Sequence, residues 1–171
     1  MRTIDKIYIH CSASLWGNFD LVDKWHKERA FTPWADLSKD RTCYVGYHFL
    51  VLNPFPTESD YKKAPMQTST TDGQLVPARP LSIVGCQVAG DNHSSIGICY
   101  IGLSPTPLQV ESMFYLCSDL ILEHNINIDS GVLGHHEYYD RIGKPREKTC
   151  PNFNMESFRA GLEFRLNVKL K

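Results

Sequence analysis

Residues 4–14 read Ile-Asp-Lys-Ile-Tyr-Ile-His-Cys-Ser-Ala-Ser. Apolar side chains dominate Ile4–His10 without strict alternation, which is typical of a strand buried on both faces of a sheet. The small polar residues that follow His10 predict a loop. Because sheet enzymes commonly place functional groups where strands run into loops, His10 is a candidate functional residue.

Strands and helices alternate along the rest of the chain. Asn18 suits the N-cap of a helix that runs to Ala30, and Thr106 and Gln109 form a capping box around Pro107. We expect further strands over residues 44–52, 95–102 and 132–135, loops over 32–42, 53–80 and 140–148, and a last helix from about residue 154. This order predicts an α/β fold with a mixed central β-sheet flanked by helices.

Composition limits the function classes. The chain has 171 residues, 42% of them hydrophobic, and a net charge of -1, which predicts one globular domain over residues 1–171. The absence of a basic excess argues against nucleic acid as a partner. No apolar stretch is long enough to insert into a membrane. The N-terminus lacks the apolar core of a signal peptide, so we expect synthesis in the cytoplasm without a signal peptide.

Cysteines are scattered along the chain rather than grouped in a disulfide pattern. They stand at positions 11, 43, 86, 99, 117 and 150. With no export signal and enough length for a core, disulfides are not expected. Cys43, Cys86, Cys99 and Cys117 are interpreted as small buried apolar residues.

Seven histidines and six cysteines offer many possible ligand sets, and neither Cys-x-x-Cys nor His-Glu-x-x-His is present. By position, the leading candidates are His10 at its strand end, His135 or His136 after a short apolar segment, and Cys150 beside a proline. Two imidazoles and a thiolate would leave one tetrahedral position open for water, which suits a catalytic zinc. Spacing alone does not choose among the sets.

Six short motifs follow one another along the chain in an order that is typical of one enzyme family. They are Ile-His-Cys-Ser-Ala-Ser (9–14), Gly-Tyr-His-Phe (46–49), Arg-Pro-Leu-Ser-Ile-Val-Gly (79–85), Asn-His-Ser-Ser-Ile-Gly-Ile-Cys-Tyr-Ile-Gly (92–102), Gly-His-His-Glu (134–137) and Lys-Thr-Cys-Pro-Asn-Phe (148–153). With these motifs the chain resembles the zinc-dependent N-acetylmuramoyl-L-alanine amidases of the short phage lysozyme type, whose fold is shared with peptidoglycan recognition proteins.

The resemblance implies a site. It implies that His10, His135 and Cys150 hold one zinc ion per chain, and that Tyr47 and Lys148 assist catalysis. The implied substrate is peptidoglycan, cleaved at the amide between N-acetylmuramic acid and L-alanine. Chemically, a tyrosine hydroxyl and a lysine ammonium can both stabilise the oxyanion of an amide-hydrolysis intermediate.

Three departures from the family pattern matter. Cys99 stands where some relatives carry a glutamate base, which favours the tyrosine and lysine mechanism. Gln87 stands where relatives often have a histidine, so we expect altered substrate contacts without loss of activity. The segment Asn53–Pro80 and the stretch from His135 to Cys150 are longer than in the short phage enzymes. We expect the first of these to border the substrate groove.

Two other functions stay open at this point. One is a recognition module that binds muropeptides without cutting them, although such relatives typically lack the cysteine ligand that Cys150 supplies. The other is a cysteine hydrolase with Cys150 as nucleophile and His135 as base. For the amidase we expect the setting of an endolysin that reaches the cell wall after release, or of a delivered domain. Its oligomeric state is left open.

Overall fold

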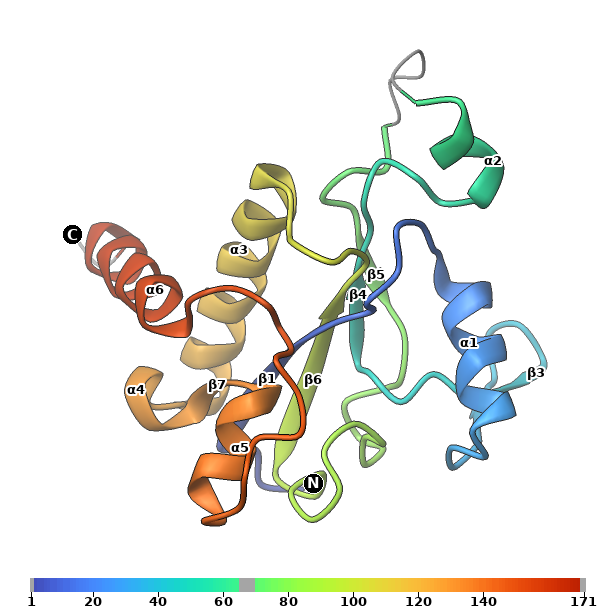
Figure 1. The fold of residues 1–171 in the computed structure, drawn as a ribbon. Helices are drawn as coiled ribbons and strands as arrows, with labels where there is room; N and C mark the ends of the chain where they lie inside the picture. The colour runs from blue at the N-terminus through green and yellow to red at the C-terminus, as the bar shows by residue number, and fades with distance from the viewer. Residues whose placement is uncertain (1, 65–69, 170–171) are drawn as a thin grey trace.

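A five-stranded mixed sheet forms the centre of the protein in a computed structural model that describes residues 2–64 and 70–169 (Figure 1). The strand order is β5-β4-β6-β1-β7. The strands are β1 (Lys6–Cys11), β4 (Phe49–Val51), β5 (Leu75–Pro77), β6 (Ser95–Tyr100) and β7 (Val132–Gly134). Strand β1 pairs in parallel with both β6 and β7, β4 is parallel to β6, and β5 runs antiparallel to β4. The mixed α/β fold predicted from the sequence is confirmed.

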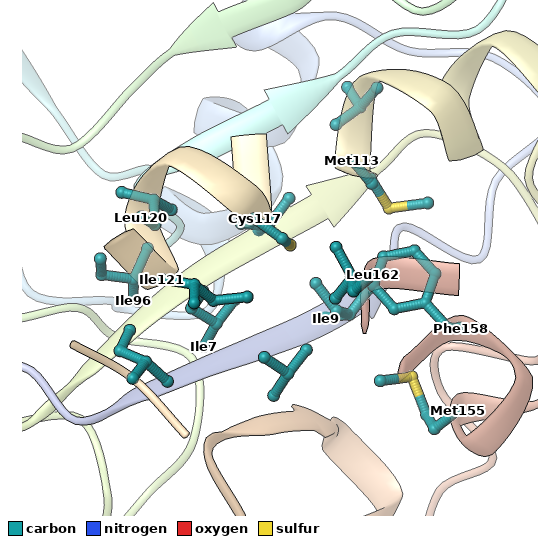
Figure 2. Packing of buried hydrophobic residues seen from close by; sticks show 14 of the residues in the cluster. Ile7, Ile9, Ile96, Met113, Cys117, Leu120, Ile121, Met155, Phe158 and Leu162 are labelled. Carbon is teal, nitrogen blue, oxygen red and sulfur yellow. The ribbon is translucent and has the colours of Figure 1, made fainter. Parts of the chain in front are cut away.

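The two faces of β1 have different surroundings. Ile7 and Ile9 belong to the main hydrophobic core, whereas Tyr8 on the other face belongs to a small separate cluster with Val88 and Leu133. His10 shares the face of Tyr8, because side chains alternate along a strand. Figure 2 shows the core side, where the β1 and β6 isoleucines meet Met113, Cys117, Phe158 and Leu162. His10 therefore lies on the face of the sheet opposite the main core.

Two long helices cover the core side of the sheet. They are α3 (Pro107–His124) and α6 (Met155–Lys169), and they lie next to each other in Figure 1, with α1 (Phe19–Glu28) on the opposite side. The predicted capping box is present, with Thr106 Oγ1 accepting from the Gln109 N–H and Gln109 Oε1 accepting from the Thr106 N–H. Gln109 also donates to the carbonyls of Val51 and Ile101, which ties α3 to the sheet. None of the described helices is long and apolar enough to cross a membrane.

The strand predicted over residues 44–52 is shorter than expected, because only β4 is regular. The backbone N–H groups of Tyr44 and Val45 both donate to Asp23 Oδ1, at 2.5 and 3.0 Å, and the Gly46 N–H donates to His26 Nδ1 at 2.9 Å. Side chains of α1 thus accept the backbone N–H hydrogen bonds that a neighbouring strand would otherwise accept. As a result, Tyr47 lies on an irregular segment just before β4.

Several short elements lie where loops were predicted. Residues 32–42 hold β2 (Trp34–Asp36), which pairs with β3 (Arg41–Cys43), and residues 53–80 hold α2 (Glu58–Lys62) and β5. Two more short helices are α4 (Ile128–Gly131) and α5 (His135–Arg141), the second of which takes the start of the predicted 140–148 loop. Elements of three to seven residues are too short for a reliable hydrophobic period. Residues 65–69 of the long connection lie outside the described residues.

Candidate active site

A cleft of about 830 Å³ opens on the sheet face that bears His10. His10 comes from β1, His135 begins α5 directly after β7, and Cys150 ends the loop that precedes α6. Tyr47 and Lys148 line the same cleft. All five residues expected at the site therefore meet in one place, although they are spread over more than a hundred positions of the chain.

The three candidate ligands lie close together. The donor atoms of His10, His135 and Cys150 lie within 4.8 Å of one another. His10 and His135 are buried, with 1% and 8% of their surface exposed, and their ring centroids are 4.6 Å apart. Ligand atoms on a tetrahedral zinc lie roughly 3.5 Å apart, so small side-chain rotations suffice to bring the set onto one ion. The residues present fit a zinc ion.

The backbone around His135 is held by a partly buried ion pair. Glu137 accepts the N–H of Gly134 at 2.8 Å, and its carboxylate pairs with Arg159 of α6 at 3.0 Å. Arg159 also donates to the carbonyl of Val132. Glu137 therefore fixes the start of α5 and does not touch the donor atoms itself.

Cys150 is held from two sides. Its carbonyl accepts the backbone N–H of His136 and lies 2.9 Å from Nδ1 of the same residue. Its Sγ accepts the backbone N–H of Cys11 at 3.1 Å. His136 thus anchors the loop that carries Cys150. Its neighbour His135, and not His136, belongs to the donor group with His10 and Cys150.

Both candidate imidazoles are in the form that binds metals. Burial, together with the adjacent His135, lowers the pKa of His10 well below its usual range. Burial and the charge of Lys148 lower the pKa of His135 to about 4. Neutral imidazoles are the ligand form of histidine. A hydrogen bond with Cys11 and burial raise the pKa of the Cys150 thiol, so the thiol favours its protonated form. A coordinated cation would reverse this, because a thiol that binds a metal ion loses its proton.

Tyr47 contributes a hydroxyl rather than a base. Its ring centroid lies 5.0 Å from that of His10, and its side chain hydrogen-bonds with Cys99 beneath it. Burial and the neighbouring Cys99 raise the pKa of Tyr47, so the hydroxyl stays protonated and can donate. Lys148 is exposed on the rim, and its charge reaches both candidate imidazoles.

The structure adds a contact to one sequence expectation about the cleft and does not support another. Gln87 lines the cleft as expected of a substrate contact, yet its Oε1 lies 2.5 Å from Nε2 of His10, so it also contacts a candidate ligand. The sequence signal for this contact was that Gln87 stands at a motif position where relatives often have histidine. The segment Asn53–Pro80 was expected to border the groove, but none of its described residues lines the cleft. Its helix α2 lies instead near Trp16, whose ring is tilted by 31° to that of Tyr61 with ring centroids 5.6 Å apart.

The cysteines agree with a reduced protein. All six lie in the described part of the chain and are free. Cys43, Cys99 and Cys117 are buried as expected, whereas Cys86 is only partly buried. Fold and site together define a class of protein: an α/β domain whose open cleft gathers two imidazoles and a thiol that can hold a divalent cation.

Comparison with known proteins narrows this class. The family profile described as N-acetylmuramoyl-L-alanine amidase matches residues 1–153. The chain is 28% identical to the endolysin of Escherichia phage T7, covering 91% of this chain and 85% of the relative, and 26% identical to that of Klebsiella phage KP32, covering 88% and 82%.

Solved structures agree on the fold. The amidase LysC from Clostridium intestinale URNW matches with a TM-score of 0.68 at 23% identity, covering 95% of this chain and 87% of that one. A Drosophila peptidoglycan recognition protein, PGRP-SD, matches with a TM-score of 0.54 at 14% identity, over 88% and 76%. The chain belongs to the N-acetylmuramoyl-L-alanine amidase family, and its activity is that of a peptidoglycan amidase.

The buried imidazoles of His26 and His48 predict acid sensitivity. Each accepts a backbone N–H, from Gly46 and Gly97, and burial lowers each pKa to about 4. Because the unfolded chain takes up these protons near pH 6.5 and the folded chain only near pH 4, stability should be unaffected above pH 6.5 and should fall between pH 6.5 and 4.

The check is urea unfolding of metal-free protein across that pH range. His48→Gln should reduce the slope of the unfolding free energy against pH by up to one proton, about 1.4 kcal/mol per pH unit. Leu162→Ala is the control, because this core truncation should cost about 2–5 kcal/mol at every pH without changing the slope. An unchanged slope in His48→Gln would contradict the assignment.

Proposed function

We propose that this amidase works with one zinc ion held by His10, His135 and Cys150, and that it cleaves the amide between N-acetylmuramic acid and L-alanine. The observation that carries the proposal is the meeting of three ligand-type side chains, from three separate elements, on the floor of the cleft. The family match and the phage relatives support the choice of bond.

The donor set suits hydrolysis. Zinc bound there would act as a Lewis acid and lower the pKa of water to about 7. The remaining work falls to the chain's own residues. Tyr47 keeps its proton and faces His10, so its hydroxyl can donate to the developing oxyanion, and the Lys148 ammonium on the rim can add its charge. Either group can also deliver a proton to the leaving amine.

A carboxylate base is not needed in this arrangement. Cys99 is fully buried beneath Tyr47, where some relatives carry a glutamate. Among the described residues that line the cleft, Glu147 is the one carboxylate, and it is exposed. The cationic side chains of Arg29, Arg146 and Lys148 also line the cleft, and they favour a substrate whose stem peptide carries carboxylates.

The cysteine-hydrolase alternative is less well supported. A nucleophilic cysteine needs a depressed pKa, whereas the Cys11 contact and burial raise the pKa of the Cys150 thiol. The recognition-module alternative leaves the gathered donors and Tyr47 without a role. By analogy with the phage endolysins, we propose that the enzyme acts on the bacterial cell wall during lysis.

Product analysis tests the reaction. Purified peptidoglycan treated with the enzyme should release stem peptides with a free L-alanine N-terminus and leave the glycan strands intact, as read by mass spectrometry. A chelator should abolish release and added zinc should restore it. New reducing sugar ends, or cuts inside the peptide, would show that the bond is wrong. Activity that survives the chelator would favour a thiol enzyme instead.

Metal content tests the ligand set. The wild-type chain should bind one zinc ion, and Cys150→Ser should lose most of it, because a serine hydroxyl is a poor zinc ligand at neutral pH. Cys86→Ser, which replaces another partly exposed cysteine, is the matched control and should keep its zinc. Full zinc occupancy in Cys150→Ser by elemental analysis would remove that residue from the site.

Substitution of Tyr47 and Lys148, the two proposed oxyanion donors, should affect turnover without affecting metal binding. Tyr47→Phe and Lys148→Ala should keep zinc and lose about 10²–10³ in kcat, the typical effect of removing one oxyanion donor. Lys144→Ala serves as control, because Lys144 is an exposed lysine of the same loop that does not line the cleft. If Tyr47→Phe or Lys148→Ala works within a few-fold of wild type, that residue has only a structural role.

A further inference from the structure

Gln87 makes a contact that the proposed reaction does not use. Its Oε1 lies 2.5 Å from Nε2 of His10, inside the cleft and next to a candidate ligand. The two residues are 77 positions apart in the chain. An amide oxygen only accepts hydrogen bonds, so the contact requires a proton on Nε2 of His10 if the amide is oriented as described.

A chain of hydrogen bonds fixes that orientation. The Ser95 hydroxyl donates to the carbonyl of Asp91 at 2.7 Å, which leaves the hydroxyl oxygen free to accept. Gln87 Nε2 donates to this oxygen at 2.9 Å. With its nitrogen directed at Ser95, the amide turns its oxygen toward His10. The order of donors therefore runs from His10 through Gln87 and Ser95 to the backbone.

The rest of the structure holds Gln87 in this position. The backbone N–H groups of Gln87 and Val88 both donate to Asn92 Oδ1, at 2.9 and 2.8 Å. A Cβ atom on Gly97 would lie 2.6 Å from both Cδ and Oε1 of Gln87. Only a glycine at this position of β6 leaves room for the amide, so the sheet itself provides the space that the Gln87 side chain occupies.

We propose that Gln87 is a positioning residue that sets the tautomer of His10. With the proton held on Nε2, the lone pair of His10 lies on Nδ1, which is then the atom available to a cation. Partners of this kind orient ligand histidines, and their loss typically costs 10–100-fold in metal affinity. The effect on affinity rests on the proposed zinc function, whereas the tautomer is a property of the metal-free chain.

Nitrogen-15 NMR of the histidine rings in metal-free protein reads the tautomer directly. The wild-type His10 should be protonated on Nε2. Gln87→Ala should shift His10 toward the other tautomer or a mixture, whereas Gln87→Glu keeps an acceptor and should preserve it. Ser95→Ala is the second test, because it leaves Gln87 in place but frees its amide to rotate, and it should also give a mixture.

Zinc affinity, measured by competition with a chromophoric chelator, is the second readout. Gln87→Ala should bind zinc 10–100-fold more weakly, and Gln87→Glu should stay near wild type. Gln74→Ala is the control, because Gln74 is an exposed glutamine that does not line the cleft. An Nε2-protonated His10 and full zinc affinity in Gln87→Ala would overturn the inference. A wild-type chain that binds no zinc would instead overturn the proposed metal site, and the NMR result would still decide the role of Gln87.

Discussion

The central position of β1 is the constraint on which the rest of the structure depends. This strand pairs in parallel with β6 on one side and β7 on the other, so it cannot shift without breaking both pairings. One face carries Ile7 and Ile9 into the hydrophobic core under α3 and α6, and the other carries His10 into the cleft. Core packing therefore fixes the position of the first candidate ligand.

The other two candidate ligands depend on polar contacts that fasten loops to this frame. The Glu137–Arg159 pair joins the start of α5 to α6 beside His135, and the Cys150 carbonyl is bound by His136. The Cys11 N–H at the end of β1 reaches Cys150 Sγ directly. Because these contacts are partly buried, removing one partner would leave an unsatisfied group, which is costly. The geometry of the donor set is thus a property of several elements and not of one motif.

Burial decides the electrostatics of the cleft. It favours the neutral form of both imidazoles and the protonated form of Tyr47, beneath which Cys99 is also buried. The cleft therefore presents candidate ligands and hydrogen-bond donors, with the charge of Lys148 at the rim. The same fold occurs in an amidase and in a peptidoglycan recognition protein. Fold similarity therefore does not separate catalysis from recognition, and under the proposed function the donor set is the feature on which that distinction depends.

The sequence by itself determined the order of the long elements, the caps at Asn18 and Thr106, and the ordered motifs that led to His10, Tyr47, His135, Lys148 and Cys150. These are local signals, carried by cap residues and short motifs. Only the tertiary structure decided which face His10 occupies, because a strand buried on both faces has no alternating pattern to read. It also decided that Tyr47 lies on an irregular segment held by α1, that the described residues of the 53–80 segment do not line the cleft, and that Gln87 reaches His10. Contacts between residues so far apart in the chain arise from packing, which a single sequence does not display.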